Sequence, residues 1–148
     1  MKYIFSIPKL FDNNRGGKKM IELYVDGASA GNPGKSGIGI FIKGEGHKVK
    51  ISESIEPTNN HTAEFLALLQ GMKEVAKLTS GIVSARSDSQ VVVMAVEKEF
   101  VKNDVHKKYL AEILQIADSF DLFFIKWIPS SENRAADALA REGIHKID

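Results

Sequence analysis

Apolar residues recur along the chain with two different periods, which predict strands and helices in alternation. Five segments rich in isoleucine, valine and phenylalanine predict strands: residues 21–25, 36–43, 47–55, 82–88 and 122–129. Four segments with apolar residues at helical spacing predict helices: residues 62–78, 90–96, 104–120 and 133–142. Three strands in succession, followed by strands that helices separate, predict an α/β domain with a mixed sheet.

Residues that start, end or interrupt regular structure set the expected boundaries. We expect Thr62 to cap the first helix and Gly81 to close it. The apolar stretch at the amino terminus is broken at Ser6 and Pro8 and lacks a small-residue cleavage site, so we do not expect an export signal. Residues 1–20 are interpreted as a flexible amino-terminal extension and residues 21–145 as the single folded domain.

Composition and charge limit the classes of function. The 148 residues are 43% hydrophobic and 26% charged, which suffices for one substantial core. Lysine and arginine total 20 against 19 acidic residues, so the net charge of +1 favours neither a basic nor an acidic tail. The absence of cysteine excludes disulfides and suits a reducing compartment, and no apolar run approaches the roughly 18 residues of a membrane span. We therefore expect a cytoplasmic monomer without a membrane partner.

Four acids occupy positions where chemistry gathers in an open α/β sheet. Asp26 ends the first predicted strand, where a glycine-rich turn begins, and Asp88 ends the fourth. Functional groups collect at the carboxyl ends of such strands. Glu64 lies in the first turn of the longest helix and Asp137 in the last helix. If the first and fourth strands are neighbours, all four carboxylates converge on one rim of the sheet.

Carboxylates gathered in this way would repel one another, and burying them unpaired would cost several kcal/mol each. Bound divalent cations relieve that cost. Oxygen ligands without cysteine or histidine suit Mg²⁺ or Mn²⁺ better than Zn²⁺. Two such ions can activate a water and stabilise the leaving oxygen in a displacement at phosphorus, so the acids indicate phosphodiester hydrolysis.

Four segments containing these acids resemble the signature segments of type 1 ribonuclease H, in the order of that family and with roughly its spacing: "YVDGASAGNPG", "TAEFLALLQGM", "SDSQVV" and "ENRAADALA". The resemblance implies an RNase H-like fold with a five-stranded mixed sheet, three antiparallel strands followed by two parallel ones, over residues 21–145. It also implies a metal-dependent endonuclease that cuts the RNA strand of RNA/DNA hybrids and leaves 3′-hydroxyl and 5′-phosphate ends. Its catalytic residues and ligands for two Mg²⁺ or Mn²⁺ ions fall on Asp26, Glu64, Asp88 and Asp137.

The same resemblance places substrate contacts on three amide side chains, those of Asn32, Asn60 and Gln90. In the family, the corresponding positions approach the minor groove, where the 2′-hydroxyl distinguishes RNA from DNA. An amide offers both a donor and an acceptor without adding charge. Backbone N–H groups around residues 29–31 could contribute similar bonds.

Two features of the best-known bacterial members are missing. The segment between the third and fourth acids has lysines, Lys98, Lys102, Lys107 and Lys108, but no aromatic-rich basic handle. The loop before the last acid, "WIPSSEN", lacks the histidine that the family uses there. The chain therefore resembles the subgroup without the handle and without this histidine, and we expect activity that is slow or has a different metal preference.

Other interpretations of these residues stay open from the sequence alone. Asp26 before a glycine is typical of a turn, Glu64 of a helix start, Asp88 of a helix cap, and Asp137 of a solvated helix face. The alternative function is a catalytically weak or inactive nucleic-acid-binding module with the same fold. A DNA resolvase on this fold is a third hypothesis, which the three amides do not favour.

Overall fold

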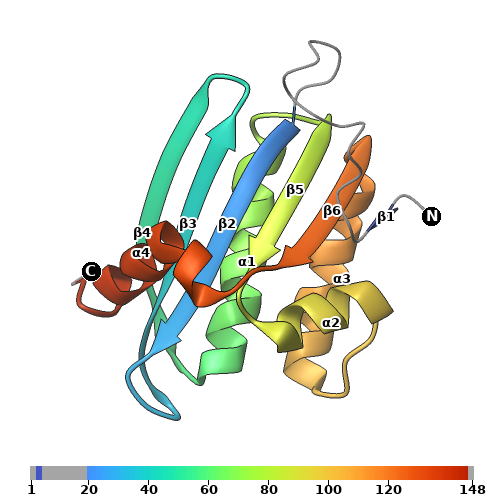
Figure 1. Ribbon diagram of the computed structural model, residues 1–148. Helices are drawn as coiled ribbons and strands as arrows, with labels where there is room; N and C mark the ends of the chain where they lie inside the picture. Colours follow the sequence, from blue (N-terminus) through green and yellow to red (C-terminus); the bar gives the residue numbers. More distant parts are fainter. Residues whose placement is uncertain (1–2, 5–19, 147–148) are drawn as a thin grey trace.

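A mixed β-sheet lies at the centre of the protein (Figure 1). The computed structural model describes residues 3–4 and 20–146. The strands are β1 (Tyr3–Ile4), β2 (Met20–Ser29), β3 (Gly34–Gly44), β4 (His47–Thr58), β5 (Ile82–Ser87) and β6 (Leu122–Trp127). The helices are α1 (Asn60–Ala76), α2 (Gln90–Lys98), α3 (Asp104–Asp118) and α4 (Arg134–Ile144), and a 3-10 turn, Ser130–Glu132, precedes α4.

The strand order is β1-β6-β5-β2-β3-β4. β2, β3 and β4 pair antiparallel, whereas β5 pairs parallel with β2 and β6 parallel with β5. The five predicted strands and their mixed pairing are therefore confirmed. At the β6 edge, β1 adds a short parallel strand that sequence analysis did not predict. Of the expected extension over residues 1–20, the structure describes only residues 3–4, which form β1, and Met20, which begins β2.

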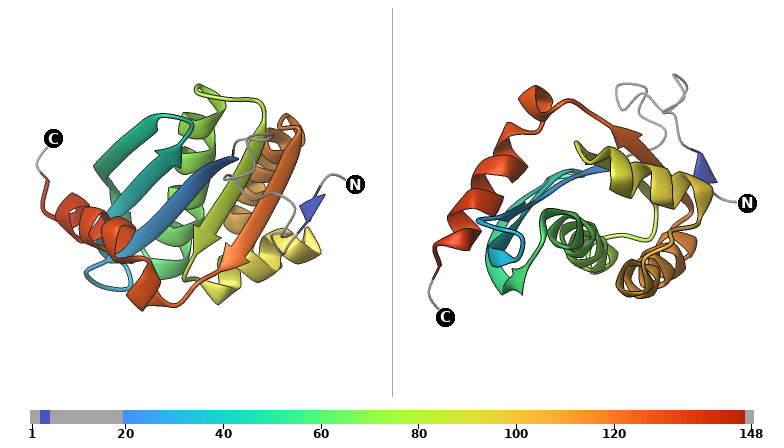
Figure 2. Two further views of the ribbon diagram at one scale, coloured as in Figure 1. Left: turned by 45° about the horizontal axis from the view of Figure 1, so that its top comes forward. Right: turned by 90° about the horizontal axis from the view of Figure 1, so that it is seen from below.

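Helices lie on both faces of the sheet. In Figure 1, α1 and α3 lie behind the sheet and α4 crosses in front of β2, β3 and β4. Figure 2 shows from below that α4 lies on the side opposite α1 and α3. Leu23 and Val25 of β2 pack with Phe65 and Leu68 of α1 in the main core, and the intervening residues of β2 point to the α4 side. No helix among the described residues is long and apolar enough to cross a membrane.

The ends of α1 differ from the prediction. Asn59 is the N-cap, because its side chain accepts a hydrogen bond from the N–H of Thr62 at 2.8 Å. The prediction that Thr62 caps the helix is therefore wrong, and its buried hydroxyl instead lies 2.9 Å from Nε2 of His106 on α3. The helix ends at Ala76, so Gly81 does not close it.

Two glycines allow helices to approach the sheet closely. A Cβ at Gly27 of β2 would overlap the backbone of Ala63, near the start of α1. A Cβ at Gly39 of β3 would overlap the backbone of Ala136 in α4. Any larger residue would push the helix away from the sheet. The two glycines therefore fix where the residues that follow Ala63 and Ala136 lie relative to β2.

Candidate active site

Three carboxylates from separate elements meet near the carboxyl ends of two neighbouring strands. Asp26 lies on β2, Asp88 directly follows β5, and Glu64 lies near the start of α1. One carboxylate oxygen of each residue lies within 4.8 Å of the other two. β2 and β5 are parallel neighbours, so their carboxyl ends meet at one edge of the sheet. The convergence that the sequence predicted for these three acids is therefore present.

The fourth predicted acid lies beside this group. Asp137 of α4 lines a cavity of about 380 Å³ together with Asp26 and Asp88. Nε of Arg141, one turn later on α4, donates to Oδ1 of Asp137 at 3.1 Å. The cavity thus receives acidic side chains from the sheet on one side and from α4 on the other.

Burial and mutual repulsion disfavour ionisation of these acids. Asp26 is only 8% exposed, and its pKa is raised to about 8, first by burial and then by the negative charges of Asp88, Asp137 and Glu64. Burial is also the main cause that raises the pKa of Glu64 and of Asp88. A cation bound between such groups would relieve both the burial cost and the repulsion.

Neighbouring groups hold two of the carboxylates in place. The backbone N–H of Gly27 donates to Oδ1 of Asp26 at 3.0 Å. Nδ1 of His61 lies 3.2 Å from Oε1 of Glu64, and hydrogen bonds from His61 and Ser89 partly offset the rise in the pKa of Glu64 that burial causes. The sequence pattern alone did not indicate a role for His61 or Ser89. For His61, the only signal was its position three residues before an acid on a helix.

Asn133, which precedes α4, ties that helix to the sheet. Its Nδ2 donates to the backbone carbonyl of Val25 at 2.9 Å. A hydrogen bond from Asn133 also opposes the rise in the pKa of Asp88 that burial causes. The side chain is 1% exposed, and its Oδ1 has no hydrogen-bond partner among the described residues. From the sequence, residue 133 was predicted only to start the last helix.

The chemistry of the donor set fits hard divalent cations. The three clustered ligand atoms are carboxylate oxygens, the kind of ligand that Mg²⁺ and Mn²⁺ prefer. The buried Oδ1 of Asn133, which has no partner among the described residues, adds a further acceptor on a side chain that also bonds Asp88, and it is suited to a bound water.

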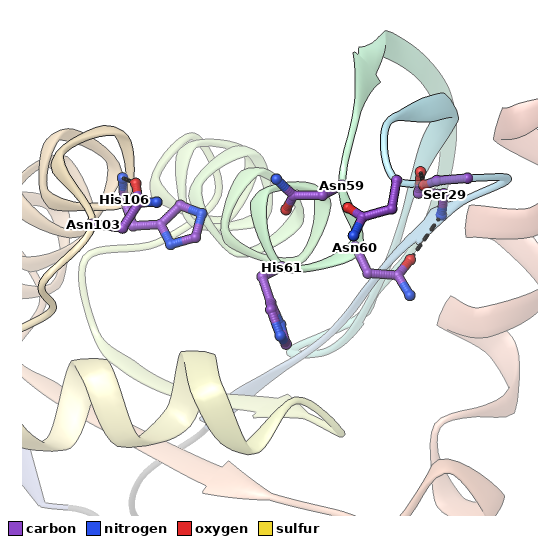
Figure 3. A pocket seen from close by; sticks show the side chains of 8 residues that line it. Ser29, Asn59, Asn60, His61, Asn103 and His106 are labelled. Atoms are coloured by element: carbon purple, nitrogen blue, oxygen red, sulfur yellow. Dashed lines mark hydrogen bonds between the residues drawn. The ribbon is translucent and has the colours of Figure 1, made fainter.

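A second, larger cavity adjoins the acidic one. It has a volume of about 650 Å³, and Figure 3 shows the polar side chains that line it. Its lining residues are Ser29, Gly31, Asn32, Asn59, Asn60, His61, Asn103 and His106. Ser29 and Asn60 line both cavities. The Oδ1 of Asn60 accepts a hydrogen bond from the N–H of Ser29 at 3.0 Å, which joins the start of α1 to the end of β2.

The three predicted amide side chains are not placed alike. Asn32 and Asn60 line the larger cavity, whereas Gln90, the exposed first residue of α2, lines neither cavity. His106, which sequence analysis did not single out, lies at the far wall, with its ring stacked on Phe65 at a centroid distance of 4.5 Å. Burial lowers the pKa of His106, and the charge of His61 lowers it further.

The segment between the third and fourth acids is compact. α2 ends at Lys98 and α3 begins at Asp104, with no further helix between them. β6 is followed only by the 3-10 turn before α4 begins. Both connections agree with the sequence, which predicted neither a basic handle nor a histidine-bearing loop in these places.

Comparisons with known proteins agree with this fold. Residues 24–143 match the family described as "Reverse transcriptase-like". A relative from Enterococcus faecalis, named "Putative hydrolase EbsB", is 38% identical over 130 residues, which cover 86% of this chain and 96% of that protein. The Ribonuclease HI of Halobacterium salinarum is 31% identical over 134 residues, covering 88% of this chain and 66% of that protein. The crystal structure of LC11-RNase H1 in complex with RNA/DNA hybrid superimposes with a TM-score of 0.76 and 32% identity, covering 84% of this chain and 96% of that one.

Proposed function

Because the chain belongs to the type 1 ribonuclease H family, we propose that it is a metal-dependent endoribonuclease that cuts the RNA strand of RNA/DNA hybrids and leaves 3′-hydroxyl and 5′-phosphate ends. The observation that carries the proposal is the group of carboxylate oxygens from Asp26, Glu64 and Asp88, which lie within 4.8 Å of one another. Asp137 lies beside this group and borders the same cavity.

These four acids would hold Mg²⁺ or Mn²⁺. Bound between carboxylates, two such ions would activate a water and stabilise the oxygen that leaves phosphorus. The protein's own contribution is to hold the ligands in position. Gly27 fixes Asp26 through its N–H, His61 holds Glu64, and Arg141 holds Asp137. Ordered ligands of this kind keep a site ready for catalysis without further rearrangement.

Polar groups that line the two cavities would recognise the RNA strand. Asn60 uses its Oδ1 to accept from Ser29, which leaves its amide N–H₂ free to donate to a ribose 2′-hydroxyl. Asn32 faces the same cavity from the loop after β2. Support for a hybrid substrate comes from the similar LC11-RNase H1, whose crystal structure contains an RNA/DNA hybrid. Gln90, exposed at the start of α2 two residues after Asp88, would contact the substrate from outside both cavities.

A cleavage assay with three duplexes tests the proposal. We expect the protein to cut only the RNA strand of an end-labelled RNA/DNA hybrid in Mg²⁺ or Mn²⁺, and to leave double-stranded RNA and DNA intact. Cleavage should cease in excess chelator, and the 5′ ends should be substrates for ligation without prior phosphorylation. Asp26→Asn should abolish cleavage, whereas the matched control Glu97→Gln, which neutralises an exposed acid on α2, should not. Full cleavage by Asp26→Asn would contradict the proposal.

A further inference from the structure

A row of cationic and aromatic side chains crosses the face of the sheet on which α4 packs, beyond that helix. Direct strand pairing joins Lys50 to Phe41, Phe41 to Tyr24, Tyr24 to Arg86, and Arg86 to Lys126. Paired residues on neighbouring strands point to the same side of a sheet. We call these five residues the sheet-face row. With strands about 4.8 Å apart, the row is roughly 19 Å long.

The centre of the sheet-face row lies next to the carboxylates, on the same face of the sheet. Asp26 and Asp88 are two residues beyond Tyr24 and Arg86 along the neighbouring β2 and β5. Side chains two positions apart point to the same face, and the separation is roughly 7 Å along the strand. That distance is within one Debye length at physiological ionic strength, about 8 Å. The centre of the row is therefore close enough to act on a polyanion held at the acidic cavity.

Contacts within the row hold its centre in a fixed arrangement. Nη1 of Arg86 donates to the hydroxyl of Tyr24 at 2.7 Å and to Oε1 of Glu22 at 2.9 Å. The rings of Tyr24 and Phe41 have their centroids 5.9 Å apart, and Nζ of Lys50 lies 5.9 Å from the centroid of the Phe41 ring. The aromatic rings thus provide a platform along which the cations are arranged.

The local charge differs from that of the whole chain. The row carries three cations, and the next row outward adds Lys43 and Lys48, which are paired across β3 and β4. Glu22, paired with Lys43, is the one acid among the outward-pointing residues of these two rows. The net charge of the whole chain is only +1, so positive charge is concentrated in these two rows.

The outer ends of the row are accessible. Lys50 on β4 and Lys126 on β6 are both exposed. α4 packs closely at Gly39, two residues before Phe41, and in Figure 1 it crosses only the lower part of the sheet. The centre of the row is less accessible. The side chain of Arg86 is 18% exposed, and Ser84 and Phe124, which point to the same face two residues earlier on β5 and β6, are fully buried.

We propose that the sheet-face row is a second nucleic-acid contact surface, which binds the phosphate backbone of the hybrid where it extends from the acidic cavity. This inference rests on the proposed function, since it assigns a partner to a surface adjoining that site. Phosphates are the ligands that complement a concentrated positive charge next to a phosphodiesterase centre. The lysines supply charge, and Arg86 and the two rings keep the surface flat and ordered. The surface adds affinity and takes no part in the chemistry.

Salt-dependent binding tests this proposal separately from cleavage. All proteins carry Asp26→Asn, and equilibrium binding of a fluorescent RNA/DNA hybrid is measured over a series of KCl concentrations in chelator. We expect the pair Lys50→Gln and Lys126→Gln to weaken binding about 3- to 10-fold at moderate salt. Each lost phosphate contact should reduce the slope of log affinity against log salt by about 0.9 in magnitude.

The matched control removes the same charge from the opposite side of the sheet. The control pair is Lys73→Gln and Lys77→Gln; Lys73 lies on α1 and Lys77 caps its end, and both side chains are exposed. α1 lies behind the sheet. The control pair should change the slope much less, and both pairs should keep the melting temperature of the parent. Equal slopes for the two pairs would overturn the sheet-face row while leaving the proposed function intact. A complete lack of hybrid binding by the parent, together with a lack of cleavage by the wild type, would overturn both.

Discussion

The Nδ2 of Asn133 donates to the backbone carbonyl of Val25, and this bond joins positions 108 residues apart. It fixes the start of α4 against β2, one residue before Asp26. Asn133→Ala leaves that buried carbonyl unpaired, so we expect the protein to lose about 1–3 kcal/mol of stability. We also expect weaker binding of Mn²⁺ and a reduced rate of hybrid cleavage, because Asp88 loses a hydrogen bond from the same side chain. Urea unfolding and Mn²⁺ titration measure the two effects. Wild-type values in both would refute this role of Asn133.

Removing the charge of Asp26 should stabilise the metal-free protein. The pKa of Asp26 is about 8 in the folded state against an ordinary 3.8. Between these values the unfolded carboxyl has released its proton while the folded one retains it, so stability falls as pH rises through this window. In chelator at pH 8.5 we expect Asp26→Asn to exceed wild type by roughly 2 kcal/mol in urea unfolding. The difference should shrink towards pH 4. A constant or reversed difference would contradict the burial and repulsion that we assign to Asp26.

The buried imidazole of His106 should make the protein less stable in mild acid. Burial lowers its pKa below the ordinary 6.5, with a further contribution from His61. Below pH 6.5 the unfolded state takes up a proton that the folded state does not, so stability falls as pH drops towards the folded pKa. His106→Gln should remove this part of the pH dependence. The measurement is urea unfolding of both proteins at pH 7.5 and pH 5.5. If both proteins lose equal stability, His106 is not the group responsible.

The close approach of α1 to β2 predicts that Gly27 accepts no side chain. A Cβ there would overlap the backbone of Ala63 and displace the start of α1, which carries Glu64. We expect Gly27→Ala to cost about 1–3 kcal/mol of stability and to reduce cleavage at least tenfold. Gly81→Ala is the control, because the nearest atom to its Cβ would be Oγ1 of Thr79 at 3.3 Å. The control should stay within about 0.5 kcal/mol of wild type. A fully active Gly27→Ala protein would show that the helix can shift without loss.

The parts of the site that the sequence predicted follow from local pattern and topology. The sequence placed Asp26 and Asp88 at the ends of predicted strands; β2 continues past Asp26 to Ser29, but Asp26 still lies near its carboxyl end. Strands joined by helical crossovers run parallel, so the meeting of the two acids needed no knowledge of side-chain packing. Thr62 shows the limit of such reasoning. Its type and position suit a helix cap, but Asn59 takes that role, and Thr62 is buried against His106, 44 residues away in the chain. The role of Asn133 could not be predicted for the same reason, since its partner, the carbonyl of Val25, lies 108 residues away on β2.

The substrate amides show a second limit of sequence reasoning. All three were assigned from their positions relative to the acids, yet Asn32 and Asn60 line the larger cavity and Gln90 lines neither cavity. The sheet-face row depends on the register between strands far apart in sequence. A shift of one residue in that register would turn its side chains to the other face of the sheet. Spacing from a motif predicts which element carries a residue, whereas the direction of its side chain depends on packing.

The bond between Asn60 and Ser29 predicts how the protein distinguishes RNA from DNA. With Oδ1 of Asn60 engaged by the N–H of Ser29 at 3.0 Å, only its N–H₂ group can donate to a 2′-hydroxyl. Asn60→Asp keeps the acceptor and removes that donor, and it adds negative charge near phosphate. We expect KM for the hybrid to rise about tenfold, and a single 2′-deoxy substitution next to the cleavage site to slow the variant less than the wild type. Asn103→Asp, at the far wall of the same cavity, adds the same charge as a control. If both variants keep wild-type discrimination at the 2′ position, Asn60 does not read the ribose.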